Sequence, residues 1–174
     1  MLGVRDKTKI LNERTTMTTT VLEVVNSTAV RVTPTDRYIL TPDRMSEDLK
    51  RLGPWRKEEK GFYVPGDDRL ELEPVVRGDE TDVHGGVVLK RVEEVTCAGQ
   101  GYAEPIARNH RIVPPAWHNL NLLFPGTIWF CRDNRAFVSA LYCSRHLARL
   151  FYFPAGQTFN KFFRIVRVNR AAAN

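Results

Sequence analysis

The sequence predicts a mostly β domain: a two-layer β-sandwich, a jelly roll or a small barrel of about nine or ten short strands with one short helix. Runs of β-branched and aromatic residues recur about every ten residues and are separated by Gly and Pro turns. Large side chains occupy both faces of the later runs, which favours two packed layers over one open sheet. A single segment has the pattern of a helix.

The first half of the chain contains a predicted hairpin, the helix and a second pair of strands. Val- and Thr-rich runs at 18–25 and 29–33 predict the hairpin. A Thr-Pro-Asp start predicts a helix over 44–52 that ends at a Gly-Pro pair. Strands at 61–64 and 69–76 follow, and the second alternates apolar with acidic residues, which indicates one buried and one solvated face.

The second half contains strands only. They are predicted at 87–97, 102–107, 111–113, 119–124, 126–132, 136–143, 147–153 and 159–168. The pair around Asp133 and Asn134 forms a hairpin, because both residues tolerate positive φ. With a two-residue loop, Ile128 would share a face with Phe137, and Trp129 would face the other way.

The chain fits one domain with a polar arm. The arm spans 1–17 and the domain spans 18–170, with an acidic part at 18–104 and a part rich in Arg and aromatic residues at 105–170. With 174 residues, of which 43% are hydrophobic, the chain can bury a core. No membrane span is expected, because no apolar run approaches the roughly 18–20 residues that a membrane helix needs.

The cysteines and the N-terminal segment bear on the compartment. Cys97, Cys131 and Cys143 have no CxxC spacing, which predicts buried thiols in a reducing, intracellular compartment. The first residues lack the apolar core of a secretory signal, so secretion is not expected. Their basic and hydroxyl residues resemble an organellar presequence, although Asp6 and Glu13 oppose that interpretation. An organelle therefore remains an alternative location.

Charge divides the chain unevenly. From residue 105 onward there are ten Arg and Lys and one acid, Asp133, whereas the first 104 residues have 16 bases and 19 acids. The same C-terminal part holds 12 of the 17 aromatic residues. A cationic, aromatic-rich part indicates an anionic partner, and phosphate is the first candidate.

Arginine dominates this cationic set, and its guanidinium group binds phosphate in a bidentate manner and stacks on bases. Cations interleaved with aromatic residues are typical of grooves that bind single-stranded nucleic acid. The predicted nucleic-acid-binding residues are Arg132, Arg135, Arg145, Arg149, Lys161, Arg164, Arg167 and Arg170. Pairing of these cations with the N-terminal acids, or with an acidic protein partner, is the alternative.

Consecutive aromatic residues indicate contacts with neighbouring subunits. In an aromatic triplet, at least one large ring must point away from the core, and such rings anchor protein interfaces. The predicted interface residues are Trp129, Phe151, Tyr152 and Phe153.

A segment that contains His118 indicates a different class of protein. The run from Arg111 to Asn119 resembles the second half of a cupin signature, in which a Pro-rich turn delivers a metal-binding His to a barrel strand. A cupin site needs two or three further ligands. His84 is the single histidine before His110, and no HxH occurs. Catalytic residues, metal ligands and cofactors are therefore not predicted.

The sequence thus predicts a non-enzymatic structural subunit of a larger assembly that contains nucleic acid, of the ribonucleoprotein or capsid type. Its partners would be RNA or another polyanion and other protein subunits. Two alternatives are a protein-only subunit of a multi-protein complex, and a small cupin-like barrel enzyme or ligand binder around His118.

Overall fold

The structure, a computed structural model, describes residues 30–60, 69–93 and 95–169. Several predictions lie outside the described residues: the polar arm at 1–17, the strands at 18–25 and 61–64, and Arg170.

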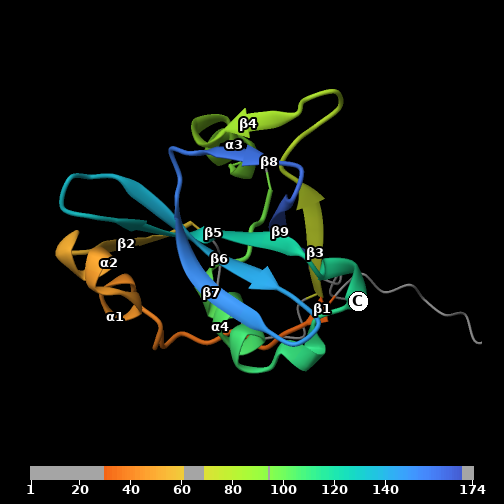
Figure 1. Cartoon of the computed structure of the whole chain (residues 1–174), viewed down its shortest axis with the longest axis horizontal. Helices are drawn as coiled ribbons and strands as arrows, with labels where there is room; N and C mark the ends of the chain where they lie inside the picture. The colour runs from red at the N-terminus through yellow and green to blue at the C-terminus, as the bar shows by residue number, and fades with distance from the viewer. Residues whose placement is uncertain (1–29, 61–68, 94, 170–174) are drawn as a thin grey trace, which may run out of the picture.

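Most strands join one mixed seven-stranded sheet with the order β1-β3-β9-β5-β6-β7 (Figure 1). These strands are β1 (Val30–Arg31), β3 (Arg69–Pro74), β9 (Phe163–Asn169), β5 (Leu120–Phe130), β6 (Ala136–Cys143) and β7 (Ala148–Pro154). β9 and β5 run parallel, and the other neighbours along this path are antiparallel. β2 (Arg56–Glu59) pairs with the second half of β5, and a separate ribbon joins β4 (Asp82–His84) to β8 (Thr158–Asn160).

Both faces of this sheet are covered, so the molecule has three layers. α4 (Gln100–Arg108) packs its Tyr102, Ala103 and Ile106 on one face. α3 (Gly85–Val92) and the β4–β8 ribbon cover the other face, as Figure 1 shows above the sheet. The short helices α1 (Pro42–Met45) and α2 (Glu47–Arg51) extend the α4 layer, and their side chains pack around Trp129.

The prediction of a mostly β chain is confirmed, but a two-layer sandwich, jelly roll or barrel is not. Seven of the described strands join one sheet with helices on both faces, and β4 and β8 form a separate two-stranded ribbon. No helix in the described ranges is long and apolar enough to cross a membrane.

The strand predicted at 87–97 is wrong, because α3 occupies most of it. Consecutive β-branched valines favour a strand locally. Val88 and Val92 are spaced by four residues, however, and both are buried against the sheet as one helical stripe. His84 caps the start of the helix by accepting a hydrogen bond from the Gly86 amide at 3.1 Å.

The strand predicted at 102–107 is also wrong, because this segment lies in α4. Pro105 inside the helix removes the amide that would bond to the Gly101 carbonyl. That carbonyl instead accepts from the Thr35 amide at 2.9 Å, which compensates for the loss. A long-range partner thus permits a helix that the local sequence disfavours.

The predicted hairpin exists, but its loop is longer than two residues. Phe130 pairs with Ala136, and Asn134 takes a φ of 63° within the loop between them. Trp129 therefore pairs with Phe137, so the predicted assignment of faces is wrong. The five-residue loop shifts the register by one residue, which reverses the faces.

The remaining elements agree in part. The strands predicted at 69–76, 136–143 and 147–153 correspond to β3, β6 and β7, and the run 159–168 is divided between β8 and β9. The predicted helix is two short helices separated at Ser46, whose hydroxyl accepts from the Leu49 amide. The run 111–113 lies mainly in a 3₁₀ turn, and β5 is continuous through an irregularity between Phe124 and Ile128.

Candidate nucleic-acid interface

One end of the sheet is built from three segments without an acidic residue, and we call it the cationic end. The segments are 118–121 before and at the start of β5, 142–149 around the β6–β7 turn, and 160–164 before and at the start of β9. Their cations are Arg145, Arg149, Lys161 and Arg164.

Strand register brings these segments together. Asn121 lies opposite Tyr142 on one side and Phe163 on the other. Tyr142 in turn lies opposite Arg149 on β7. The Asn121 amide also donates to the Phe162 carbonyl at 2.9 Å. Segments separated by some forty residues of sequence therefore form one continuous surface, three strand spacings of about 4.8 Å across.

The cations of this end have no carboxylate partner among the described residues. Arg145, Arg149 and Lys161 are exposed, and no carboxylate lies within 4.0 Å of them in the ranges that the structure covers. Arg164 donates to the Phe163 carbonyl at 2.8 Å. Asp82, opposite Asn160 in the β4–β8 ribbon, marks the boundary of the end. Such a surface attracts anions.

Exposed hydrophobic side chains accompany these cations. Tyr142 is 39% exposed, Leu147 is 50% exposed and Phe162 is 51% exposed. The Lys161 ammonium nitrogen lies 5.6 Å from the centroid of the Phe162 ring. The Tyr142 hydroxyl lies 3.5 Å from the Asn119 side-chain oxygen. Both aromatic side chains thus lie beside cations and are partly open to solvent.

Six acids of the N-terminal part form ion pairs with bases of the same part. These ion pairs are Lys50–Glu47, Arg56–Glu58, Lys57–Glu59, Lys60–Glu93, Arg77–Glu73 and Arg91–Glu80. Hydrogen bonds from Arg91 lower the pKa of the Glu80 carboxyl to about 2. Internal pairing between the two parts of the chain is therefore limited, and it does not reach the cationic end within the described ranges.

The other predicted cations lie elsewhere. Arg132 and Arg135 lie in the β5–β6 loop, at the opposite end of β6 from Arg145, about 25 Å away along an eight-residue strand. Arg135 pairs there with Asp133 at 3.4 Å. Arg167 lies within β9, where its guanidinium group meets Glu73 on β3 at 3.1 Å. The structure therefore brings four of the predicted cations together.

The predicted interface residues are mostly core residues. Trp129 and Tyr152 are buried, with exposures of 8% and 7%. Phe151 and Phe153 are half-buried on the opposite face of β7, where Phe153 packs on Phe159 and Phe163 at ring-centroid distances of 5.0 Å.

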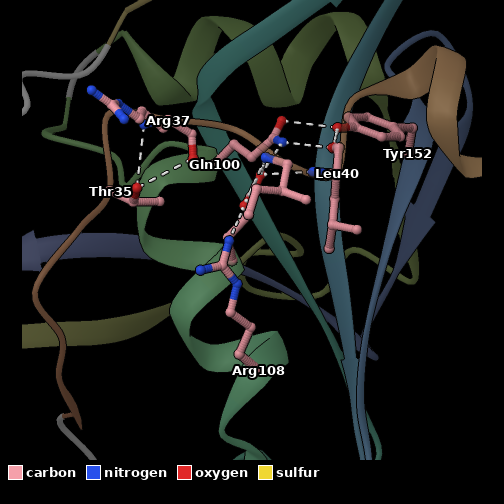
Figure 2. A network of polar contacts seen from close by, with 8 residues as sticks. Thr35, Arg37, Leu40, Gln100, Arg108 and Tyr152 are labelled. Atoms are coloured by element: carbon pink, nitrogen blue, oxygen red, sulfur yellow. Dashed lines mark hydrogen bonds and ion pairs between the residues drawn. The ribbon is translucent and has the colours of Figure 1, made fainter.

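A buried polar network, which the sequence interpretation missed, lies far from this surface (Figure 2). Gln100 and Glu104 project from α4 and are fully buried. The side-chain nitrogen of Gln100 donates to the Leu40 carbonyl at 2.8 Å and to the Glu104 carboxylate at 3.0 Å. Its oxygen accepts from Trp129 at 2.8 Å and from Tyr152 at 3.0 Å. Each polar atom of the Gln100 side chain is therefore satisfied.

The Glu104 carboxylate binds the segment before α1. It accepts hydrogen bonds from the Ile39 amide at 3.0 Å and from the Leu40 amide at 3.2 Å. Arg108, one turn later on α4, donates to its second oxygen at 3.0 Å (Figure 2). A buried charge with these three partners fixes the segment to the helix.

The network continues to Tyr38, which bonds to Glu59 on β2. Tyr38 donates to Glu59 at 2.8 Å, and Thr127 donates to the same carboxylate at 2.7 Å. Burial raises the pKa of Tyr38, and burial also raises the pKa of Tyr152, both well above the ordinary range. Neither phenol exchanges a proton near neutral pH. Among the described residues, no buried side-chain polar atom is left without a hydrogen-bond partner.

A cavity of about 420 Å³ lies between the start of α3 and the ends of β6 and β7. Its walls include Leu89, Ala136 and Pro154, and His84 and Arg135 line it as well. His84 already caps α3 through its Nδ1 atom. The cavity is separate from the cationic end, since Arg135 belongs to the opposite end of the sheet.

His118 is half-buried at the end of the 3₁₀ turn Pro115–Trp117, and its amide donates to the Pro115 carbonyl at 3.1 Å. Within the described residues, no three His, Cys, Asp or Glu side chains gather as metal ligands would. The geometry thus defines a cationic surface with exposed aromatic rings. No protein-family model, no curated protein and no solved structure matches this chain.

Proposed function

We propose that this protein is a non-enzymatic subunit of an assembly that contains nucleic acid, of the ribonucleoprotein or capsid type, and that its cationic end contacts RNA. The observation that supports this most is the convergence of Arg145, Arg149, Lys161 and Arg164 on three acid-free segments at one end of the sheet. Each cation without a carboxylate partner can neutralise a phosphate and release a counterion.

Arginine predominates in this set, which favours phosphate. Its planar guanidinium group forms two parallel hydrogen bonds with phosphate oxygens. Arginine and aromatic residues are also enriched in protein interfaces, so an acidic protein is the competing partner. Half-buried Phe151 and Phe153 on β7 are the residues proposed to meet neighbouring subunits.

The three cysteines are free and buried. Their burial fits a protein that works in a reducing compartment, which we propose is intracellular.

Native purification with and without nuclease tests the proposed function. We expect the untreated protein to retain RNA that nuclease or added salt removes. The observed affinity for a single-stranded oligonucleotide should fall linearly with salt on a log–log scale. Recovery of a nucleic-acid-free protein complex whose composition nuclease leaves unchanged would instead identify the protein-only subunit.

A further inference from the structure

We infer that the cationic end binds single-stranded RNA, whose unpaired bases stack on Tyr142 and Phe162. This inference rests on the proposed function and adds to it the form of nucleic acid and the two residues that recognise it. It follows from the arrangement of these rings around the start of β5.

Tyr142 and Phe162 flank the start of β5 on its two sides. Tyr142 lies opposite Asn121 in the β5–β6 pair, and the Phe162 carbonyl accepts from the Asn121 amide in the β5–β9 pair. The two backbones are therefore about 10 Å apart across the sheet. Exposed rings cost free energy in water unless a partner covers them, and a base has a flat, apolar face that does so.

Charges and polar groups complete the site. Lys161 lies beside the Phe162 ring, and Arg149 lies opposite Tyr142, so each ring has a cation next to it. Asn121 lies between the two flanking strands and Asn119 lies beside Tyr142, and their side-chain amides offer both donors and acceptors to base edges. In an A-form duplex the base faces are stacked on one another and are not accessible to protein side chains. The combination of open rings with flanking cations therefore favours a single strand.

The experiment measures binding by fluorescence anisotropy with a labelled 12-nucleotide oligouridylate and with a 12-base-pair RNA duplex. We expect the full chain to bind the single strand more tightly. Tyr142→Ala and Phe162→Ala should each weaken single-strand binding by about tenfold, whereas the slope of affinity against salt should stay the same because the rings are uncharged.

Matched controls separate stacking from loss of structure. Tyr142→Phe retains the ring and should bind within about twofold of the wild type, and Ile39→Ala removes an equally exposed side chain at a distant position. Thermal unfolding of each variant verifies that it is folded, so that a change in affinity reports on the rings.

The outcomes are distinct. Equal binding of duplex and single strand, with Tyr142→Ala and Phe162→Ala unchanged, would overturn the inference and leave the proposed function standing. Failure to bind either RNA at low salt would overturn both. An acidic protein that binds the cationic end in place of RNA, and that loses affinity in the same two variants, would also overturn both.

Discussion

The two ends of the central sheet differ in how their charged side chains are paired. At the end near α1, α2 and β2, which we call the capped end, ion pairs such as Lys57–Glu59 and Arg135–Asp133 form within the chain. At the cationic end, Arg145 and Arg149 have no carboxylate partner in the described residues, and aromatic rings are exposed. Ion pairs thus form at the capped end, whereas none is found at the cationic end within the described residues.

This difference shows that the charge imbalance of the sequence is a local feature. The overall net charge is +6, and among the described residues six acids of the N-terminal part pair with bases of the same part. The excess positive charge is therefore concentrated where three acid-free segments meet.

The largest effect on stability is expected at the buried carboxylate near the capped end. Glu104→Ala removes the acceptor for the Ile39 and Leu40 amides and should lower the free energy of unfolding by about 3 kcal/mol. Arg108→Ala is the control, with a loss of about 1 kcal/mol, because the Arg108 side chain is 51% exposed. Urea denaturation measures both. A loss below about 0.5 kcal/mol for Glu104→Ala would show that the network does not stabilise this end.

A smaller loss is expected where α3 meets the turn after β7. A Cβ atom at Gly85 would lie 1.6 Å from the Ala155 carbonyl oxygen, so Gly85→Ala must displace backbone and should cost about 2 kcal/mol. Gly156 is the matched control, since a Cβ atom there meets nothing within 4 Å. Equal thermal shifts for Gly85→Ala and Gly156→Ala would contradict this close packing of α3.

The sequence predicts some elements of this fold correctly and others wrongly. Alternation of apolar and acidic residues located β3, and runs of β-branched and aromatic residues between turns located β6 and β7. The valines before Val92 and the proline in α4, however, led to the prediction of strands where the structure has two helices. Gln100 and Glu104 are four residues apart with Tyr102, Ala103 and Ile106 around them, and a helical interpretation would have placed both on the buried face. The spacing of Gln100 and Glu104 thus indicates a helix, but Pro105 within the segment argued against one.

The sequence shows which residue types the candidate site contains, but it does not show which of these residues come together in the fold. The excess of Arg after residue 105 is visible in the sequence, yet Arg132 and Arg145 belong to opposite ends of one strand. Which cations converge depends on the parallel pairing of β9 with β5, a contact between distant segments that no local pattern specifies.

Alkaline pH tests the core between the two ends. Burial raises the pKa of the Cys97 and Cys143 thiols to about 12, whereas these thiols ionise near 9.0 when exposed. Since the folded state favours the protonated thiol, this contribution to stability is complete below about pH 9 and is lost as pH rises toward about 12. Urea midpoints should fall more between pH 8 and pH 10.5 for the wild type than for a Cys97→Ala/Cys143→Ala variant. Parallel decreases would contradict the protonated, buried state of these thiols.

The smallest effect on stability is expected at the cationic end itself. Replacing Arg145 or Arg149 by Ala removes an exposed cation without a carboxylate partner and should change the free energy of unfolding by less than about 0.5 kcal/mol, with a gain possible through weaker repulsion. Thermal denaturation at low salt measures this change. A loss above about 1 kcal/mol for either variant would reveal an internal role and would weaken the contrast between the ends.

The most direct test of the central claim compares the salt dependence of RNA binding when each end loses its cations. The Arg145→Ala/Arg149→Ala/Lys161→Ala variant should reduce the log–log slope for a single-stranded oligonucleotide by about 2, because each lost phosphate contact removes about 0.7. The Arg132→Ala/Arg135→Ala variant should leave the slope unchanged. Equal reductions in both variants, or no reduction in the first, would contradict the account that one end of the sheet is the nucleic-acid interface.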